Sequence, residues 1–120
     1  MRILKGLGIL LVILGGFAVA KENTLGIHEI SHVKFETTVR IGANVLPAGE
    51  YTIRHTMEGQ EHVMVFKRDN GKKEQFKAKC TLVRLDKNAP HDQVVYQITA
   101  DNQRVVQELV FRGDSAKHVF

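Results

Sequence analysis

The stretch VLPAGEYTI, residues 45–53, places Pro, Ala and Gly in succession and then alternates apolar with polar residues. Pro47 suits the first corner of a turn because its ring restricts φ, and Gly49 can adopt the positive φ that leaves a turn. Beyond the turn, Tyr51 and Ile53 share one face of an extended chain. The stretch therefore predicts a turn that leads directly into a half-buried β-strand.

The same period of two continues on both sides of this turn. Upstream, VKFETTVRI (residues 33–41) predicts one strand with its odd-numbered residues inward. Downstream, alternating stretches follow as far as a short last strand in AKHVF (residues 116–120). We expect about seven strands, joined sequentially and without a helix. This predicts an all-β fold, an antiparallel meander that forms a small barrel or a sandwich.

Turn chemistry predicts how the strands pair. A two-residue loop at Glu58-Gly59 places His55 opposite His62 and Ile53 opposite Met64, so that the apolar residues share one face. The DNG stretch at residues 69–71 forms the next hairpin, and one extra residue, a bulge, keeps its apolar residues in register. The further pairs expected are Phe66 with Phe76, Met64 with Ala78, His62 with Cys80, Ile98 with Val105, and Val94 with Leu109.

The inward positions of these strands predict a single apolar core. Fifteen side chains of this size fill a small domain and leave little room for an enclosed cavity. The expected core residues are Val33, Phe35, Val39, Ile41, Tyr51, Ile53, Met64, Phe66, Phe76, Leu82, Val94, Tyr96, Ile98, Leu109 and Phe111.

The first 20 residues have the features of a secretory signal peptide. Arg2 and Lys5 form a basic start, an apolar run follows, and Ala18 and Ala20 provide the small residues that signal peptidase requires. The run is shorter than the roughly 20 apolar residues that span a bilayer. We therefore expect cleavage after Ala20, with a retained membrane anchor as the alternative.

Cleavage would leave a polar N-terminal arm, residues 21–30, and a single domain, residues 31–120. The loss of two basic residues lowers the formal net charge from +4 to +2. The expected location is the periplasm or the medium outside the cell, with no integral membrane span after cleavage. Cys80 is the single cysteine, so no internal disulfide can form.

A resemblance covers nearly the whole mature chain. The order VRIGANVLPAGEYTI, LVRLDKNAPHDQVV and a final hairpin ending in HVF is similar to small exported bacterial proteins that carry an LPAGxY turn. The resemblance implies a compact β-domain of the cell envelope. It supplies no catalytic residue.

His55, His62 and Cys80 form the candidate metal site, because the hairpin pairing brings them to one face of three neighbouring strands. Imidazole nitrogen and thiolate sulfur are ligands for Zn or Cu. Alternatively, the two imidazoles cap the end of the apolar face and Cys80 is a small buried hydrophobe. The four histidines without a comparable pairing are His28, His32, His91 and His118.

Enzymatic activity is not expected. The mature chain contains two serines, neither in a Gly-x-Ser-x-Gly motif, and it lacks both His-Glu-x-x-His and a phosphate-binding glycine loop. Asp86, His91 and Asp92 share one loop, which a turn-rich connection containing Pro90 explains. No cofactor or nucleic acid is expected. The basic residues of one hairpin predict a solvated outer face, and they are Lys67, Arg68, Lys72, Lys73, Lys77 and Lys79.

These observations predict a non-enzymatic binding or structural module of the bacterial cell envelope, whose partner is a protein or an envelope polymer. The alternatives are a lipocalin-like carrier of a small ligand, with its ligand inside a barrel, and a weak metal-binding domain that uses His55, His62 and Cys80.

Overall fold

The computed structural model of the protein describes residues 9–14, 26–70 and 74–120. This part of the chain is all-β, as the alternation predicts, but it contains ten strands instead of about seven. They are β1 (Ile9–Leu14), β2 (Ile30–Phe35), β3 (Val39–Ile41), β4 (Asn44–Leu46), β5 (Gly49–Glu58), β6 (Glu61–Arg68), β7 (Gln75–Arg84), β8 (Asp92–Ile98), β9 (Arg104–Val110) and β10 (Ala116–Val119). The described residues include no helix of the length and apolarity needed to cross a membrane.

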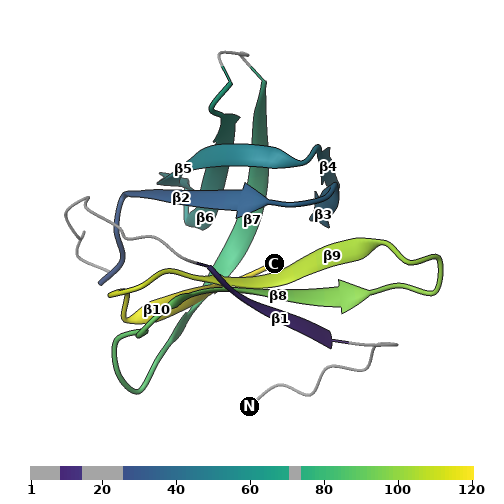
Figure 1. The fold of residues 1–120 in the computed structure, drawn as a ribbon. Coiled ribbons are helices and arrows are strands. Elements are labelled where there is room, and N and C mark those ends of the chain that lie inside the picture. The colour runs from purple at the N-terminus through teal and green to yellow at the C-terminus, as the bar shows by residue number, and fades with distance from the viewer. Residues whose placement is uncertain (1–8, 15–25, 71–73) are drawn as a thin grey trace.

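The strands form one sheet that folds into two layers (Figure 1). The order β2-β5-β6-β7 makes one layer, and β7-β10-β9-β8-β1 makes the other. β7 belongs to both, because residues 75–80 pair with β6 and residues 81–84 pair with β10. Neighbouring strands are antiparallel except β3 and β9, which run parallel. The sheet is not closed, so the barrel alternative is wrong and the two-layered alternative fits.

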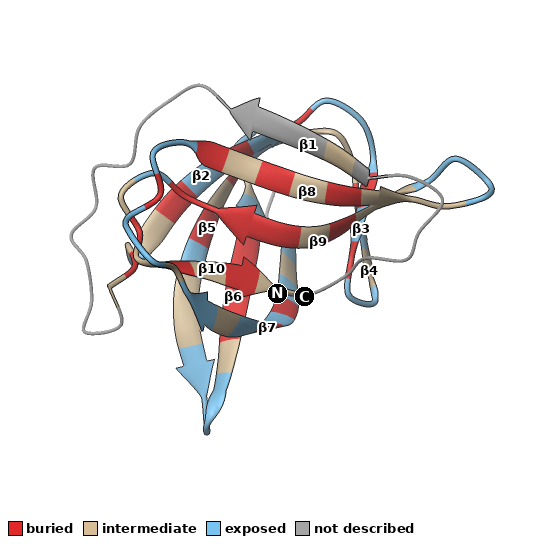
Figure 2. Cartoon of the chain, turned by 90° about the horizontal axis from the view of Figure 1, so that it is seen from below, coloured by how far each residue is buried: buried red, intermediate tan, exposed pale blue. Residues whose placement is uncertain are grey.

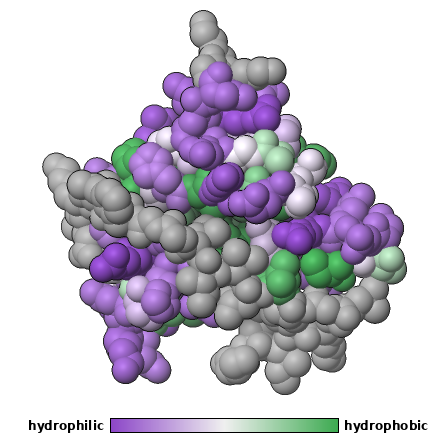
Figure 3. All heavy atoms as spheres, in the orientation of Figure 1, coloured by the Kyte–Doolittle hydropathy of each residue, from purple (hydrophilic) through white to green (hydrophobic). Residues whose placement is uncertain are grey.

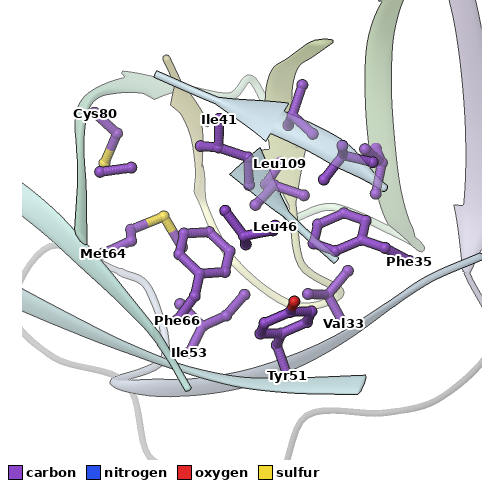
Figure 4. Packing of buried hydrophobic residues seen from close by; sticks show 14 of the residues in the cluster. Val33, Phe35, Ile41, Leu46, Tyr51, Ile53, Met64, Phe66, Cys80 and Leu109 are labelled. Carbon is purple, nitrogen blue, oxygen red and sulfur yellow. The ribbon is translucent and has the colours of Figure 1, made fainter. Parts of the chain in front are cut away.

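The turn before β5 forms as predicted. Gly49 has a φ of 148° and begins the strand. Tyr51 is completely buried, and its hydroxyl donates a 2.6 Å hydrogen bond back to the carbonyl of Pro47. The Tyr51 ring also packs against Phe35 and Phe66, with centroids 5.8 and 6.5 Å away (Figure 4). One side chain thus ties the turn to the core.

The strand predicted for residues 33–41 is instead divided into two. Residues 36–38 are exposed and leave the first layer, in which β2 pairs with β5. β3 then pairs with β4 and β9 in the second layer. A straight strand cannot serve both layers, although Val39 and Ile41 stay buried as expected. The periodicity identified the inward residues but not the crossing between layers.

The pairing predicted for β5 and β6 is wrong by two residues. The loop is Gly59-Gln60, and His55 lies opposite Met64 while Met57 lies opposite His62. Gly59 has a φ of 62°, which a hairpin turn with glycine at its first central position requires. Because the side-chain period is two, a shift of two residues leaves every side chain on its predicted face.

The predicted pairing of β6 with β7 is confirmed, including His62 opposite Cys80. The turn that joins them includes residues 71–73, which lie outside the described residues. In the β8–β9 hairpin, Val94 lies opposite Leu109 as predicted, but Ile98 lies opposite Arg104 and not Val105. The register changes by one residue between Val95 and Tyr96, because the paired strand β9 has one extra residue there, a bulge.

Twelve of the fifteen expected core residues are buried, and Phe76, Leu82 and Ile98 are half-buried (Figure 2). Leu46 and Val106 were not expected in the core but are completely or almost completely buried. β6 also buries residues of its outer face. Those residues are Val63 and Val65, which lie opposite Lys79 and Lys77 on β7. The ammonium groups of Lys79 and Lys77 form salt bridges with Glu61 and Glu58.

The N-terminal segment is described only in part. Residues 9–14 of the predicted signal peptide form β1, which pairs with β8. The basic start and the expected cleavage point after Ala20 lie outside the described residues. At the end of the predicted N-terminal arm, Ile27 is completely buried, and the backbone N–H of His28 donates to Asp114 at 3.1 Å. Residues 26–30 are therefore packed against the domain.

Replacing Tyr51 with Phe tests the bond that holds the turn. The substitution keeps the ring in the core but removes the donor to the Pro47 carbonyl. We expect the free energy of unfolding to fall by about 0.5–1.5 kcal/mol, the usual net value of one such bond. Urea denaturation measures this change. An unchanged unfolding midpoint and slope would show that the hydroxyl does not stabilise the turn.

Candidate metal centre

Four strands bring three histidines and the cysteine to one end of the core. His55 lies on β5, His62 on β6, Cys80 on β7 and His118 on β10. Ligand atoms of His55, Cys80 and His118 all lie within 4.8 Å of one another. Figure 4 shows Cys80 at the margin of the apolar cluster, beside Met64.

The backbone positions of these residues follow from the strand pairing. His62 and Cys80 face each other across β6 and β7, and His118 pairs with Leu82 two residues further along β7. Residues two apart on a strand point to the same side. Cys80 lies at the point where β7 leaves one layer and enters the other. The cluster forms where residues of both layers meet.

Two direct contacts link members of the cluster. The Cys80 Sγ lies 3.7 Å from His118 Nδ1, and His62 Nδ1 lies 3.4 Å from His55 Nε2. The rings of His55 and His118 have centroids 5.3 Å apart. The His118 ring also packs edge-on against the Phe111 ring, with centroids 5.8 Å apart. This packing limits the orientations available to His118.

The cluster lies in an environment that disfavours charge. His118 is 1% exposed, and burial, reinforced by the neighbouring His55 and His62, lowers its pKa from 6.5 to about 3. Burial followed by repulsion from His62 also lowers the pKa of His55. Burial raises the pKa of the Cys80 thiol to about 11. At neutral pH, His55 and His118 are uncharged and Cys80 is a thiol.

His55 retains an unused donor or acceptor. Its Nδ1 is buried and has no hydrogen-bond partner among the described residues. Buried polar atoms are usually paired, so an unpaired imidazole nitrogen beside a thiol and a second imidazole is unusual. Such a nitrogen is available as a metal ligand.

The structure changes the membership of the predicted site. His55, His62 and Cys80 lie on one face as expected, but the third member within 4.8 Å of both His55 and Cys80 is His118, not His62. His62 instead contacts His55 at the side of the cluster. No partner was predicted for His118 because its short strand follows a turn without a distinctive pairing signal. The alternation in AKHVF, which places Ala116 and His118 on one face, was the available signal.

The other sequence candidates occupy structural positions. His91 is exposed, and Asp92 is buried and accepts a 2.6 Å hydrogen bond from the backbone N–H of Arg112. The Ser115 hydroxyl donates to the carbonyl of Gly26. Asp92 and Ser115 thus hold neighbouring loops together, and their polar groups are engaged with the backbone.

Comparison with protein-family models, with curated proteins and with solved structures finds no match to this chain.

Burial of neutral His118 predicts a loss of stability in acid. The unfolded chain binds a proton near pH 6.5 and the folded chain only near pH 3, so the stabilisation is complete above pH 6.5 and is lost as the pH falls toward 3. Each tenfold difference in proton affinity corresponds to about 1.4 kcal/mol, which gives a total of at most about 5 kcal/mol. Urea denaturation at a series of pH values between 7 and 4 measures the slope.

His118→Gln should flatten this slope whatever its effect on stability at pH 7. His91→Ala is the matched control, because His91 is exposed and should leave the slope unchanged. Equal slopes in the parent protein and His118→Gln would contradict burial of a neutral imidazole at this position.

Proposed function

We propose that the protein is a non-enzymatic domain of the cell envelope that binds one Zn²⁺ or Cu⁺ ion through His55, Cys80 and His118. The observation that supports this function is the convergence of two imidazoles and a thiol, with ligand atoms within 4.8 Å of one another, at the junction of the two layers. The sequence predicted an exported binding module, and this proposal names a metal ion as its ligand.

One separation within the proposed ligand set is close to that between two ligands of a bound ion. Bond lengths of about 2.05 Å to nitrogen and about 2.3 Å to sulfur place tetrahedral ligands about 3.35 Å apart for two nitrogens and about 3.6 Å apart for nitrogen and sulfur. The Cys80 to His118 separation is 3.7 Å. The ligand atoms of His55, Cys80 and His118 all lie within 4.8 Å of one another. A movement of a few tenths of an ångström would bring Cys80 and His118 to the spacing of bound ligands, and a larger movement, of up to about 1.5 Å, would bring in His55.

The donor types suit soft or borderline metal ions. Thiolate selects Cu⁺ or Zn²⁺, and imidazole binds both. Binding requires Cys80 to release its proton, and the positive metal favours the thiolate that burial alone disfavours. One thiolate with Cu⁺ is electrically neutral, whereas one thiolate with Zn²⁺ retains a positive charge. The low exposure of the site therefore favours Cu⁺ over Zn²⁺.

A shallow pocket gives access to the cluster from outside. It has a volume of about 310 Å³ and is lined by residues that include His62, Cys80, Lys79 and Phe120. An ion entering there would meet His62 and Cys80 before the more deeply buried His118. In this proposal His62 acts as an entry ligand or as the fourth ligand of a tetrahedral site.

The structure offers less support for a lipocalin-like carrier. Aromatic and aliphatic side chains fill the space between the two layers (Figure 4). A carrier of that class needs an interior cavity with an open mouth. We propose no enzymatic activity for the domain and name no particular protein or polymer partner.

Metal titration of the purified protein tests the proposal. We expect saturable binding of one equivalent of Zn²⁺ in a competition assay, and of one equivalent of Cu⁺ under anaerobic conditions. Cys80→Ser and His55→Ala should each weaken the affinity by at least about tenfold, because outer partners alone commonly contribute that much and direct ligands contribute more. His91→Ala should bind as the parent protein does.

His62→Ala distinguishes the possible ligand sets. Retained stoichiometry with an unchanged affinity identifies a three-ligand site, and a loss like that of His55→Ala identifies four ligands. Circular dichroism checks that each variant is folded. Absence of stoichiometric binding by the folded parent protein, with either ion, would overturn the proposed function.

A further inference from the structure

The sheet ends at two strands, and one of them is β1. The order of strands runs from β1, beside β8, to β2, beside β5 (Figure 1). β1 pairs with β8 in the antiparallel sense along its whole length, from Ile9 with Gln97 to Leu14 with Asp92. Because β1 lies within the predicted signal peptide, cleavage after Ala20 would remove it. β8 would then end the second layer, with the backbone N–H and C=O groups on that side unpaired.

The core of the domain does not depend on β1. In the described part of the chain, every residue of the buried apolar cluster lies between Val33 and Phe111. Leu10 of β1 is half-buried and packs against the margin of that cluster, and it pairs with Tyr96. We therefore expect the mature chain to fold without β1 and to expose a narrow apolar margin beside β8.

The two ends of the sheet differ in charge. β2 carries exposed His32 and Lys34 on its outer face, and lysine on an edge strand commonly prevents pairing with another chain. The outer-face residues of β8 are Gln93, Val95 and Gln97, which are half-buried and uncharged. β8 thus lacks the protection that β2 has, as suits a strand whose edge is meant to be paired.

Backbone pairing is the attraction that the β8 edge offers. On the face of the molecule seen in Figure 3, hydrophilic residues predominate and hydrophobic ones emerge between them in small patches. The charged residue of β8, Asp92, is buried and accepts a hydrogen bond from the backbone N–H of Arg112, so its charge is engaged within the domain. A partner strand would add main-chain hydrogen bonds and cover the apolar margin beside β8.

We propose that the β8 edge of the mature protein binds an extended, apolar segment of another polypeptide in the place that β1 occupies in this structure. The pairing of residues 9–14, ILLVIL, shows the kind of segment that the edge accepts. The bound segment runs antiparallel to β8 and extends the second layer by one strand. An apolar side chain at the position of Leu10 covers the margin of the core. This inference rests on the predicted cleavage and is independent of metal binding.

A peptide with the sequence ILLVIL between flanking lysines, which keep it soluble, is the probe. The mature protein, residues 21–120, should bind it saturably, with shifts of ¹⁵N-labelled backbone amides concentrated at residues 92–98. The full-length chain should bind it at least about tenfold more weakly, because its own linked β1 competes at a high effective concentration. Leu10→Asp in the full-length chain should recover the binding, since it weakens the hold of β1 on the edge.

N-methylated peptides distinguish strand pairing from non-specific apolar association. In an antiparallel pair, alternate residues direct their N–H groups toward the partner strand. Methylation of one alternate series of peptide nitrogens should therefore abolish binding, whereas methylation of the other series should largely preserve it. Equal binding of the two methylated peptides would overturn the proposed pairing.

Substitutions in the domain locate the site. Val95→Lys should weaken peptide binding by at least about tenfold, because it gives β8 the kind of edge charge that β2 carries. Val83→Lys is the matched control, because Val83 is an exposed valine on β7, which β9 and β10 separate from β8. Circular dichroism checks that each variant is folded. Equal weakening by the two substitutions would overturn the assignment to β8.

The natural state of the chain decides whether the edge is open. Mass spectrometry of the exported protein should find an N-terminus at Lys21, and a chain that keeps residues 9–14 would overturn the proposal. So would a folded mature protein that takes up no peptide. If that protein also sediments as a dimer, the edge belongs to a second copy of this chain and not to an apolar partner.

Discussion

The passage of β7 from one layer to the other is the constraint on which the arrangement of the molecule depends. Its residues 75–80 complete the layer of β2, β5 and β6, and its residues 81–84 begin the layer of β10, β9 and β8. A single strand thus joins the two halves through continuous backbone pairing. The short β10 then lies beside the end of β7, and side chains from both layers converge around Cys80.

This convergence places polar side chains where the core would otherwise be apolar. His118 is almost completely buried, packs against Phe111 and contacts the Cys80 thiol. A buried imidazole costs free energy unless its nitrogens are paired, and the unpaired Nδ1 of His55 adds to this cost. Three apolar side chains would fill the same space without that cost. The proposed metal ion would offset this cost by engaging these nitrogens.

The sequence predicted the elements of the fold better than their connections. Alternation correctly assigned Phe35, Tyr51 and Leu109 to the core because the side-chain period depends on local geometry alone. The crossing at residues 36–38 depends on how the layers stack, which a local period does not encode. The register of β5 and β6 was wrong by two residues because both Glu58-Gly59 and Gly59-Gln60 suit a two-residue loop.

The candidate site was predictable to the same extent. His55, His62 and Cys80 follow from hairpin pairing between sequence neighbours, and the even register error kept them on one face. His118 arrives from a strand 38 residues beyond Cys80, and it pairs with β7 only because β7 extends into the second layer. No hairpin rule connects these two strands. Long-range pairing therefore determined the part of the site that sequence reasoning missed.

X-ray absorption spectroscopy of the metal-loaded protein tests the central claim most directly, because it reports the atoms bound to the ion. The account predicts one sulfur ligand at about 2.3 Å and at least two imidazole nitrogens at about 2.0 Å. The sulfur contribution should disappear in Cys80→Ser. A shell of nitrogen and oxygen alone in the parent protein would contradict a metal site at the junction of the two layers.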